Sequence, residues 1–101
     1  MNKHPYHLGR LAEYKIRDYY ASKGYVVFRL AGSKPFDLIA LRNDEILLIE
    51  VKRGTSFNKE EVLKKLNIVR HLYPDLPIRV LVVLYKPLRG KREIREVQVF
   101  P

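Results

Sequence analysis

The chain has 101 residues, the size of one small domain, so we expect a single domain over residues 1–101. It contains no cysteine, which excludes a disulfide framework, a Cys-ligated metal centre and a thiol nucleophile. Lys and Arg number 20 against 11 Asp and Glu, and the net charge of +9 favours a polyanionic partner. The apolar runs are too short to cross a membrane, and the basic N-terminus lacks the form of a secretory signal. We therefore expect a cytoplasmic, intracellular protein.

The first two expected elements are a helix and a strand. Apolar residues recur at three- and four-residue spacing from Leu8 to about Lys23, which predicts an amphipathic helix. Gly24 follows at the position where helices often end in a left-handed residue. Residues 25–31 (YVVFRLA) are β-branched and aromatic, which is typical of a strand. The segment 32–35 (GSKP) interrupts that strand.

A hairpin is predicted next. Residues 36–42 (FDLIALR) and 45–52 (EILLIEVK) form two strands that are separated only by Asn43 and Asp44. Both of these residue types tolerate left-handed backbone, which suits a two-residue turn.

The second half of the chain contains a helix and two strands. Asn58 has the character of a helix N-cap, with Glu61 three residues later completing a capping box, and Pro74 ends the helix. Residues 78–85 (IRVLVVLY) are almost continuously apolar, which predicts a strand covered on both faces. Residues 86–92 are interpreted as a basic loop and residues 93–100 as a last strand. The order αβββαββ predicts an α/β fold in which helices flank a central mixed sheet.

The hairpin brings two carboxylates together. If Asn43 and Asp44 form the turn, Asp37 lies opposite Glu50, and Lys52 lies on the same face of the sheet. Opposed like charges are destabilising, and a divalent cation such as Mg²⁺ or Mn²⁺ that bridges both carboxylates would offset their repulsion. An alternative of equal weight is a solvated end of the hairpin, where these acids pair with surface lysines.

A third acid, Glu13, borders the apolar stripe of the first helix, so its side chain could reach the same site. From the residues alone, a solvated Glu13 that pairs with Arg10 or Arg17 is the favoured interpretation.

Asp37 followed by Glu50-Val51-Lys52 has the form of the catalytic motif of the PD-(D/E)xK nucleases, with Phe36 in place of the nominal proline. A longer ordered set resembles the archaeal Holliday junction resolvases. It consists of Gly9-x-x-x-Glu13, the run from Gly24 to Arg29, the run from Ala31 to Lys34, Asp37-Leu38 and the run from Ile49 to Lys52. The resemblance covers residues 8–53, and it implies a restriction-endonuclease-like fold. One departure is Tyr14, which stands where these resolvases usually have Arg.

The resemblance also implies roles for the matching positions. Asp37 and Glu50 would bind Mg²⁺, for which Mn²⁺ substitutes, with the Val51 carbonyl as a further ligand. Lys52 would orient or help deprotonate the attacking water, and Glu13 would hold a water or contribute to the metal site. Ser33 would contact the scissile region of the substrate. The residues that we expect to contact DNA are Arg10, Arg29, Ser33, Lys34, Arg53, Lys86, Arg89, Lys91 and Arg92.

The implied function is a Mg²⁺-dependent endonuclease that resolves four-way DNA junctions by paired phosphodiester hydrolysis, with roles in recombination and repair. A homodimer would supply two active sites for two opposed strands. Two alternatives stay open. One is a PD-(D/E)xK nuclease for flaps, single strands or foreign duplex DNA, and the other is a non-catalytic basic DNA-binding protein. The absence of Cys, the single Met and the plentiful Lys, Arg and Glu suit a thermophile.

The segment from Lys86 to Arg95 contains five of the chain's cations. We favour contact with the DNA backbone there, and the alternative is an ordinary solvated loop.

Overall fold

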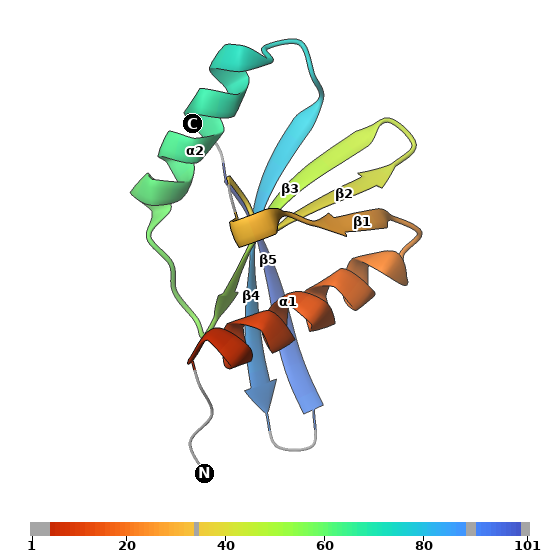
Figure 1. Ribbon diagram of the computed structural model, residues 1–101, viewed down its shortest axis with the longest axis vertical. Coiled ribbons are helices and arrows are strands. Elements are labelled where there is room, and N and C mark those ends of the chain that lie inside the picture. The colour runs from red at the N-terminus through yellow and green to blue at the C-terminus, as the bar shows by residue number, and fades with distance from the viewer. Residues whose placement is uncertain (1–4, 34, 89–90, 100–101) are drawn as a thin grey trace.

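A computed structural model describes the backbone of residues 5–33, 35–88 and 91–99, and the side chains of residues 10–32, 35–87 and 91–99 (Figure 1). Its elements in chain order are α1 (Pro5–Ala21), β1 (Val26–Arg29), the short 3₁₀ turn η1 (Ala31–Ser33), β2 (Leu38–Arg42), β3 (Glu45–Arg53), α2 (Lys59–Leu72), β4 (Ile78–Leu88) and β5 (Lys91–Val99).

The five strands form one sheet in the order β1-β2-β3-β4-β5. The β3–β4 pair is parallel, and the other pairs are antiparallel. The parallel pair requires a crossover, which α2 provides. The predicted α/β fold with a central mixed sheet is therefore confirmed.

Each helix covers a different face of the sheet. Ala12, Ile16 and Tyr20 of α1 pack with one set of strand residues, whereas Val62 and Leu66 of α2 pack with the set that alternates with it. Because side chains alternate along a strand, β4 contributes to both cores, as the sequence predicted. The result is a layer of sheet between two helices.

The ends of both helices follow local sequence signals. At the end of α1 the amide of Gly24 donates to the carbonyl of Ala21 at 3.0 Å, and the amide of Tyr25 donates to the carbonyl of Tyr20 at 3.2 Å. This paired arrangement is a Schellman motif, and Gly24 adopts the positive φ of 91° that it requires. At the start of α2 the Asn58 side chain accepts a hydrogen bond from the amide of Glu61 at 3.2 Å, which confirms the predicted N-cap.

The predicted two-residue hairpin turn is also confirmed. Arg42 pairs with Glu45, so Asn43 and Asp44 alone connect β2 and β3. Asn43 takes a left-handed φ of 52°, a conformation that Asn tolerates better than most residues.

The predicted basic loop at residues 86–92 is wrong where the structure describes it. The strand β4 continues to Leu88 and β5 begins at Lys91, so these residues form a long hairpin that projects at the bottom of Figure 1. The register pairs Lys86 with Glu93 and Pro87 with Arg92. The high density of charged residues suggested a loop. Backbone hydrogen bonds between strands can form whatever the charge of the side chains, as long as those side chains point into solvent. Charged residues are also common on edge strands.

The first strand is shorter than the predicted residues 25–31: β1 covers only Val26–Arg29, and η1 takes Ala31. Within η1, Gly32 has a φ of 65°, which ends extended structure before Asp37. Among the described residues, no helix is long and apolar enough to cross a membrane.

Candidate active site

Asp37 is fixed by three backbone contacts just before β2. Its amide donates to the carbonyl of Ile49 at 3.0 Å, and its carbonyl accepts from the amide of Leu30 at 3.0 Å. Its carboxylate oxygen Oδ2 accepts from the amide of Val51 at 2.7 Å. Through this contact the Asp37 side chain, in place of a backbone carbonyl, continues the hydrogen bonding between the two strands beyond the start of β2. Asp37 is 7% exposed.

Glu50 lies next to it in β3 and is 4% exposed. The neighbouring pair Leu38–Ile49 shows that the predicted register is correct. Burial raises the pKa of Glu50 above its ordinary value, and the nearby Asp37 carboxylate raises it further. The register also pairs Glu50 with Val82 of the α2-side core, so the carboxylate lies on the face that α2 covers.

Two lysines approach the same oxygen of Glu50. Lys52 Nζ lies 3.9 Å from Oε2, and Lys65 Nζ of α2 lies 3.1 Å from it. The prediction that Lys52 shares the face of Glu50 is confirmed, because Lys52 pairs with Leu84 of the α2-side core.

Sequence reasoning did not assign Lys65 to the site. A signal was available, since Lys65 directly precedes the core residue Leu66 and follows Val62 by three positions. A residue at that spacing flanks the buried stripe of the helix.

Glu13 belongs to α1, which covers the opposite face of the sheet. Its carboxylate pairs with Arg29 at 3.2 Å, and its role at a metal stays a prediction. Tyr14, the departure from the resolvase pattern, packs under two guanidinium groups: those of Arg29 and Arg17 lie 4.7 and 5.0 Å from its ring centre. Cation–π contacts of this kind hold guanidinium groups in place.

The expected DNA-binding residues are divided between the two faces. Paired residues share a face, so Lys86 and Lys91, which pair with Glu93 and Leu88, follow Leu84 on the face of Glu50. Arg92 pairs with Pro87 and lies on the other face. Lys34, Arg89 and the Ser33 side chain lie outside the described residues. Arg10 is half-buried on α1, and Arg53 is exposed at the end of β3.

The donor chemistry fits a hard divalent cation. Asp37, just before β2, and Glu50 of β3 provide carboxylate oxygens, and such ions prefer oxygen ligands. Among the described residues, no three His, Asp or Glu side chains gather into a metal-binding group. The pKa of Glu50 is raised mainly by burial and further by the Asp37 carboxylate, and a bound cation would offset both effects.

Comparisons with known proteins identify similar chains. No protein-family model matches. Crossover junction endodeoxyribonuclease Hjc of Methanocaldococcus jannaschii is 36% identical over an alignment of 66 residues, which covers 61% of this chain and 50% of that protein. The chain thus spans about half the length of the curated relative it matches. The solved structure of Archaeoglobus fulgidus Hjc, a Holliday junction resolvase from an archaeal hyperthermophile, is similar with a TM-score of 0.65 and 23% identity, covering 85% of this chain and 72% of that one.

The structural similarity shows that this chain has the fold of the Hjc resolvase. Both named proteins are called Hjc, and the one with the solved structure is a Holliday junction resolvase from an archaeal hyperthermophile. The resemblance that the sequence suggested is therefore confirmed.

Proposed function

We propose that this chain belongs to the archaeal Holliday junction resolvases and is a Mg²⁺-dependent endonuclease that cuts four-way DNA junctions. The observation that supports this best is the buried pair Asp37 and Glu50, with Lys52 on the same face of the sheet. A basic protein that only bound DNA would gain nothing from two buried carboxylates, whereas phosphodiester hydrolysis uses such a pair to hold a metal.

Asp37, Glu50 and Lys52 would have different roles in the hydrolysis. Asp37 and Glu50 would hold a divalent cation, which would supply a Lewis acid to activate water and offset phosphate charge. Asp37 is oriented for this by the Val51 amide. Lys52, whose side chain is 41% exposed, reaches solvent and would orient the attacking water and stabilise charge on the phosphate. The products would be a 5′-phosphate and a 3′-hydroxyl.

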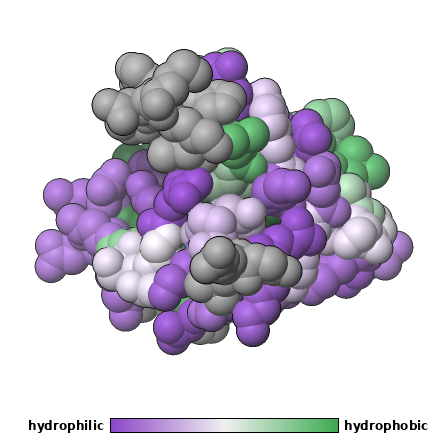
Figure 2. Space-filling model, turned by 90° about the horizontal axis from the view of Figure 1, so that it is seen from below, coloured by the Kyte–Doolittle hydropathy of each residue, from purple (hydrophilic) through white to green (hydrophobic). Residues whose placement is uncertain are grey.

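Substrate DNA would lie along the face of Glu50, where the long hairpin extends past the site. Arg53, the last residue of β3, pairs with Tyr85, and β4 continues beyond that point to Leu88. Lys86, Lys91 and Arg95 therefore lie on the Glu50 face beyond the carboxylates. The end of the molecule seen from below is largely hydrophilic (Figure 2). Cations in this position would contact the phosphate backbone.

Glu13, Arg10, Arg29, Ser33 and Lys34 keep the roles that the resemblance implies. Arg29 would contact the phosphate backbone while Glu13 and Tyr14 hold its guanidinium group.

A homodimer would present two such sites to a junction that has two-fold symmetry. The chain offers a surface for it at the end of α2, where Ile68, Leu72, Tyr73 and Leu76 are 61%, 62%, 56% and 48% exposed. We call these four residues the α2 apolar patch. Exposed apolar residues that cluster in this way are typical of protein–protein contacts.

The test compares a labelled four-way junction with a linear duplex of the same sequence, in Mg²⁺ and in EDTA. Wild type should cut only the junction and only with metal. Asp37→Asn and Glu50→Gln should lower the cutting rate about a hundredfold or more while junction binding persists. The matched control is Asp44→Asn, an exposed acid in the turn of the same hairpin, and it should cut at the wild-type rate.

The alternatives give different results. Equal cutting of junction and duplex would favour a nuclease for other DNA substrates. Junction binding without any metal-dependent cutting would favour the non-catalytic DNA-binding protein.

A further inference from the structure

Lys65 forms an ion pair with the Glu50 carboxylate, which the proposed metal would also bind. Its Nζ lies 3.1 Å from Glu50 Oε2, closer than Lys52 at 3.9 Å. Its position is set by α2, because Val62 and Leu66 on either side of it are 2% and 0% exposed. The ammonium group also lies 5.7 Å from the ring centre of the buried Phe36. Lys65 is therefore directed into the site by the packing of the helix.

A divalent cation and this ammonium group compete for the same oxygen. Both are positive, and at a separation of a few ångströms in a partly buried site their repulsion is strong. The flexible four-carbon stem of lysine allows its ammonium group to move without a change in the helix, and the side chain is 27% exposed, so solvent is within its reach.

We propose that Lys65 is a positioning residue which holds the Glu50 carboxylate in the metal-free protein and is displaced from it when a divalent cation binds. This inference rests on the proposed function, because it assumes that Asp37 and Glu50 bind the metal. The ion pair orients the buried carboxylate for the cation, at the cost of a weaker metal affinity.

The first experiment measures displacement directly. Lysine acetylation is followed by mass spectrometry in wild-type protein with and without Mn²⁺, with the exposed neighbour Lys64 as the internal reference. Without metal, Lys65 should react several-fold more slowly than Lys64. Saturating Mn²⁺ should raise the Lys65 rate several-fold and leave the Lys64 rate unchanged.

The second experiment measures Mn²⁺ affinity by calorimetry in Lys65→Met and in its matched control Lys64→Met, which removes the same charge one residue away. Loss of the competing cation should tighten Mn²⁺ binding about tenfold in Lys65→Met, whereas Lys64→Met should bind as wild type does. Circular dichroism checks the fold of both variants, and the acetylation experiment needs no variant.

Several outcomes would overturn the proposal. If Lys65 and Lys64 react equally without metal, the ion pair does not exist in solution. If Mn²⁺ binds while Lys65 stays protected, or if Lys65→Met binds it no more tightly, the displacement is wrong and the proposed function stands. If no Mn²⁺ binds to wild type, the metal chemistry of the proposed function fails as well.

Discussion

Two glutamates of β3 show how strongly the surroundings of a single residue decide its chemistry. Glu50 is buried beside Asp37, and its pKa is raised. Glu45, five residues earlier, accepts hydrogen bonds from Arg42 and Tyr25, each at 2.9 Å, and mainly the Arg42 contact lowers its pKa. The same residue type on the same strand is therefore buried beside a second carboxylate at one end and held by Arg42 and Tyr25 at the other.

Glu45 makes the folded protein sensitive to acid. The pKa of Glu45 is lower in the folded state than its ordinary value of 4.5 in the unfolded chain. The ionised carboxylate therefore stabilises the fold at neutral pH. This contribution is lost as the pH falls below 4.5 and through the folded-state pKa. We expect Glu45→Gln to be less stable than wild type in urea unfolding at pH 7, with a smaller difference at pH 3. The control is Asp44→Asn in the adjacent turn. A difference that does not shrink in acid would contradict this prediction.

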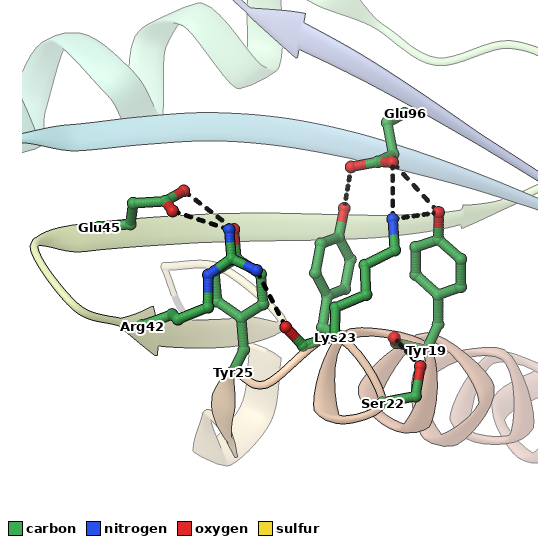
Figure 3. A network of polar contacts seen from close by, with 8 residues as sticks. Tyr19, Ser22, Lys23, Tyr25, Arg42, Glu45 and Glu96 are labelled. Atoms are coloured by element: carbon green, nitrogen blue, oxygen red, sulfur yellow. Dashed lines mark hydrogen bonds and ion pairs between the residues drawn. The ribbon is translucent and has the colours of Figure 1, made fainter.

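Between elements, the C-terminal end of α1 is joined to β5 by a polar network. The Tyr20 hydroxyl donates to Glu96 at 2.6 Å and the Tyr19 hydroxyl donates to it at 3.2 Å, while Lys23 lies 3.8 Å from the same carboxylate. Tyr19, Lys23 and Glu96 face one another in Figure 3. This network ties the first helix to a strand that lies 76 residues away in the chain.

Tyr20 is the buried member of this network, at 1% exposure. Removal of its hydroxyl in Tyr20→Phe leaves the ring in the core but breaks a short hydrogen bond to a charged group, which should lower the free energy of unfolding by about 2 kcal/mol. The matched variant Tyr19→Phe breaks a longer and more exposed contact and should cost less. Equal losses in urea unfolding would show that burial does not strengthen the Tyr20 contact.

On the scale of the whole molecule, the exposed large apolar residues fall into two groups among the side chains that the structure describes. One is the α2 apolar patch, and the other consists of Val26, Phe28 and Leu41 on β1 and β2, which are 59%, 54% and 39% exposed. In the first group Ile68 and Leu72 lie four residues apart on α2, and Tyr73 and Leu76 follow just beyond its end. Such an apolar surface can pack against its own symmetry mate.

We expect wild-type protein to sediment as a dimer and Leu72→Glu to sediment as a monomer at the same concentration. A buried, unpaired carboxylate at an apolar interface is strongly unfavourable. The control variant Phe28→Glu places the same charge among the exposed apolar residues of β1 and β2, and this variant should remain a dimer. A dimeric Leu72→Glu would contradict the assignment, and a monomeric Phe28→Glu would move the interface to β1 and β2.

Local sequence patterns were enough to predict the turn that brings the carboxylates together and the ends of the helices. The Asn43-Asp44 turn fixes the register of the β2–β3 hairpin, and that register alone places Asp37 beside Glu50 and Lys52 on their face. Gly24 and Asn58 likewise identify helix ends, because capping contacts join residues that are near each other in the chain. The carboxylate pair and the fold class therefore follow from patterns that span only short stretches of the chain.

Contacts between residues far apart in the chain depend on how the helices pack on the sheet and how the strands pair. Lys65 reaches Glu50 only because α2 packs on the same face of the sheet, and periodicity cannot say which face a helix will cover. The helix α1 packs on the other face, which is why Glu13 pairs with Arg29. The cations of residues 86–92 suggested a loop, but cross-strand hydrogen bonds between β4 and β5 extend the hairpin past the site. Contacts across long stretches of chain depend on packing and strand pairing, which no local pattern records.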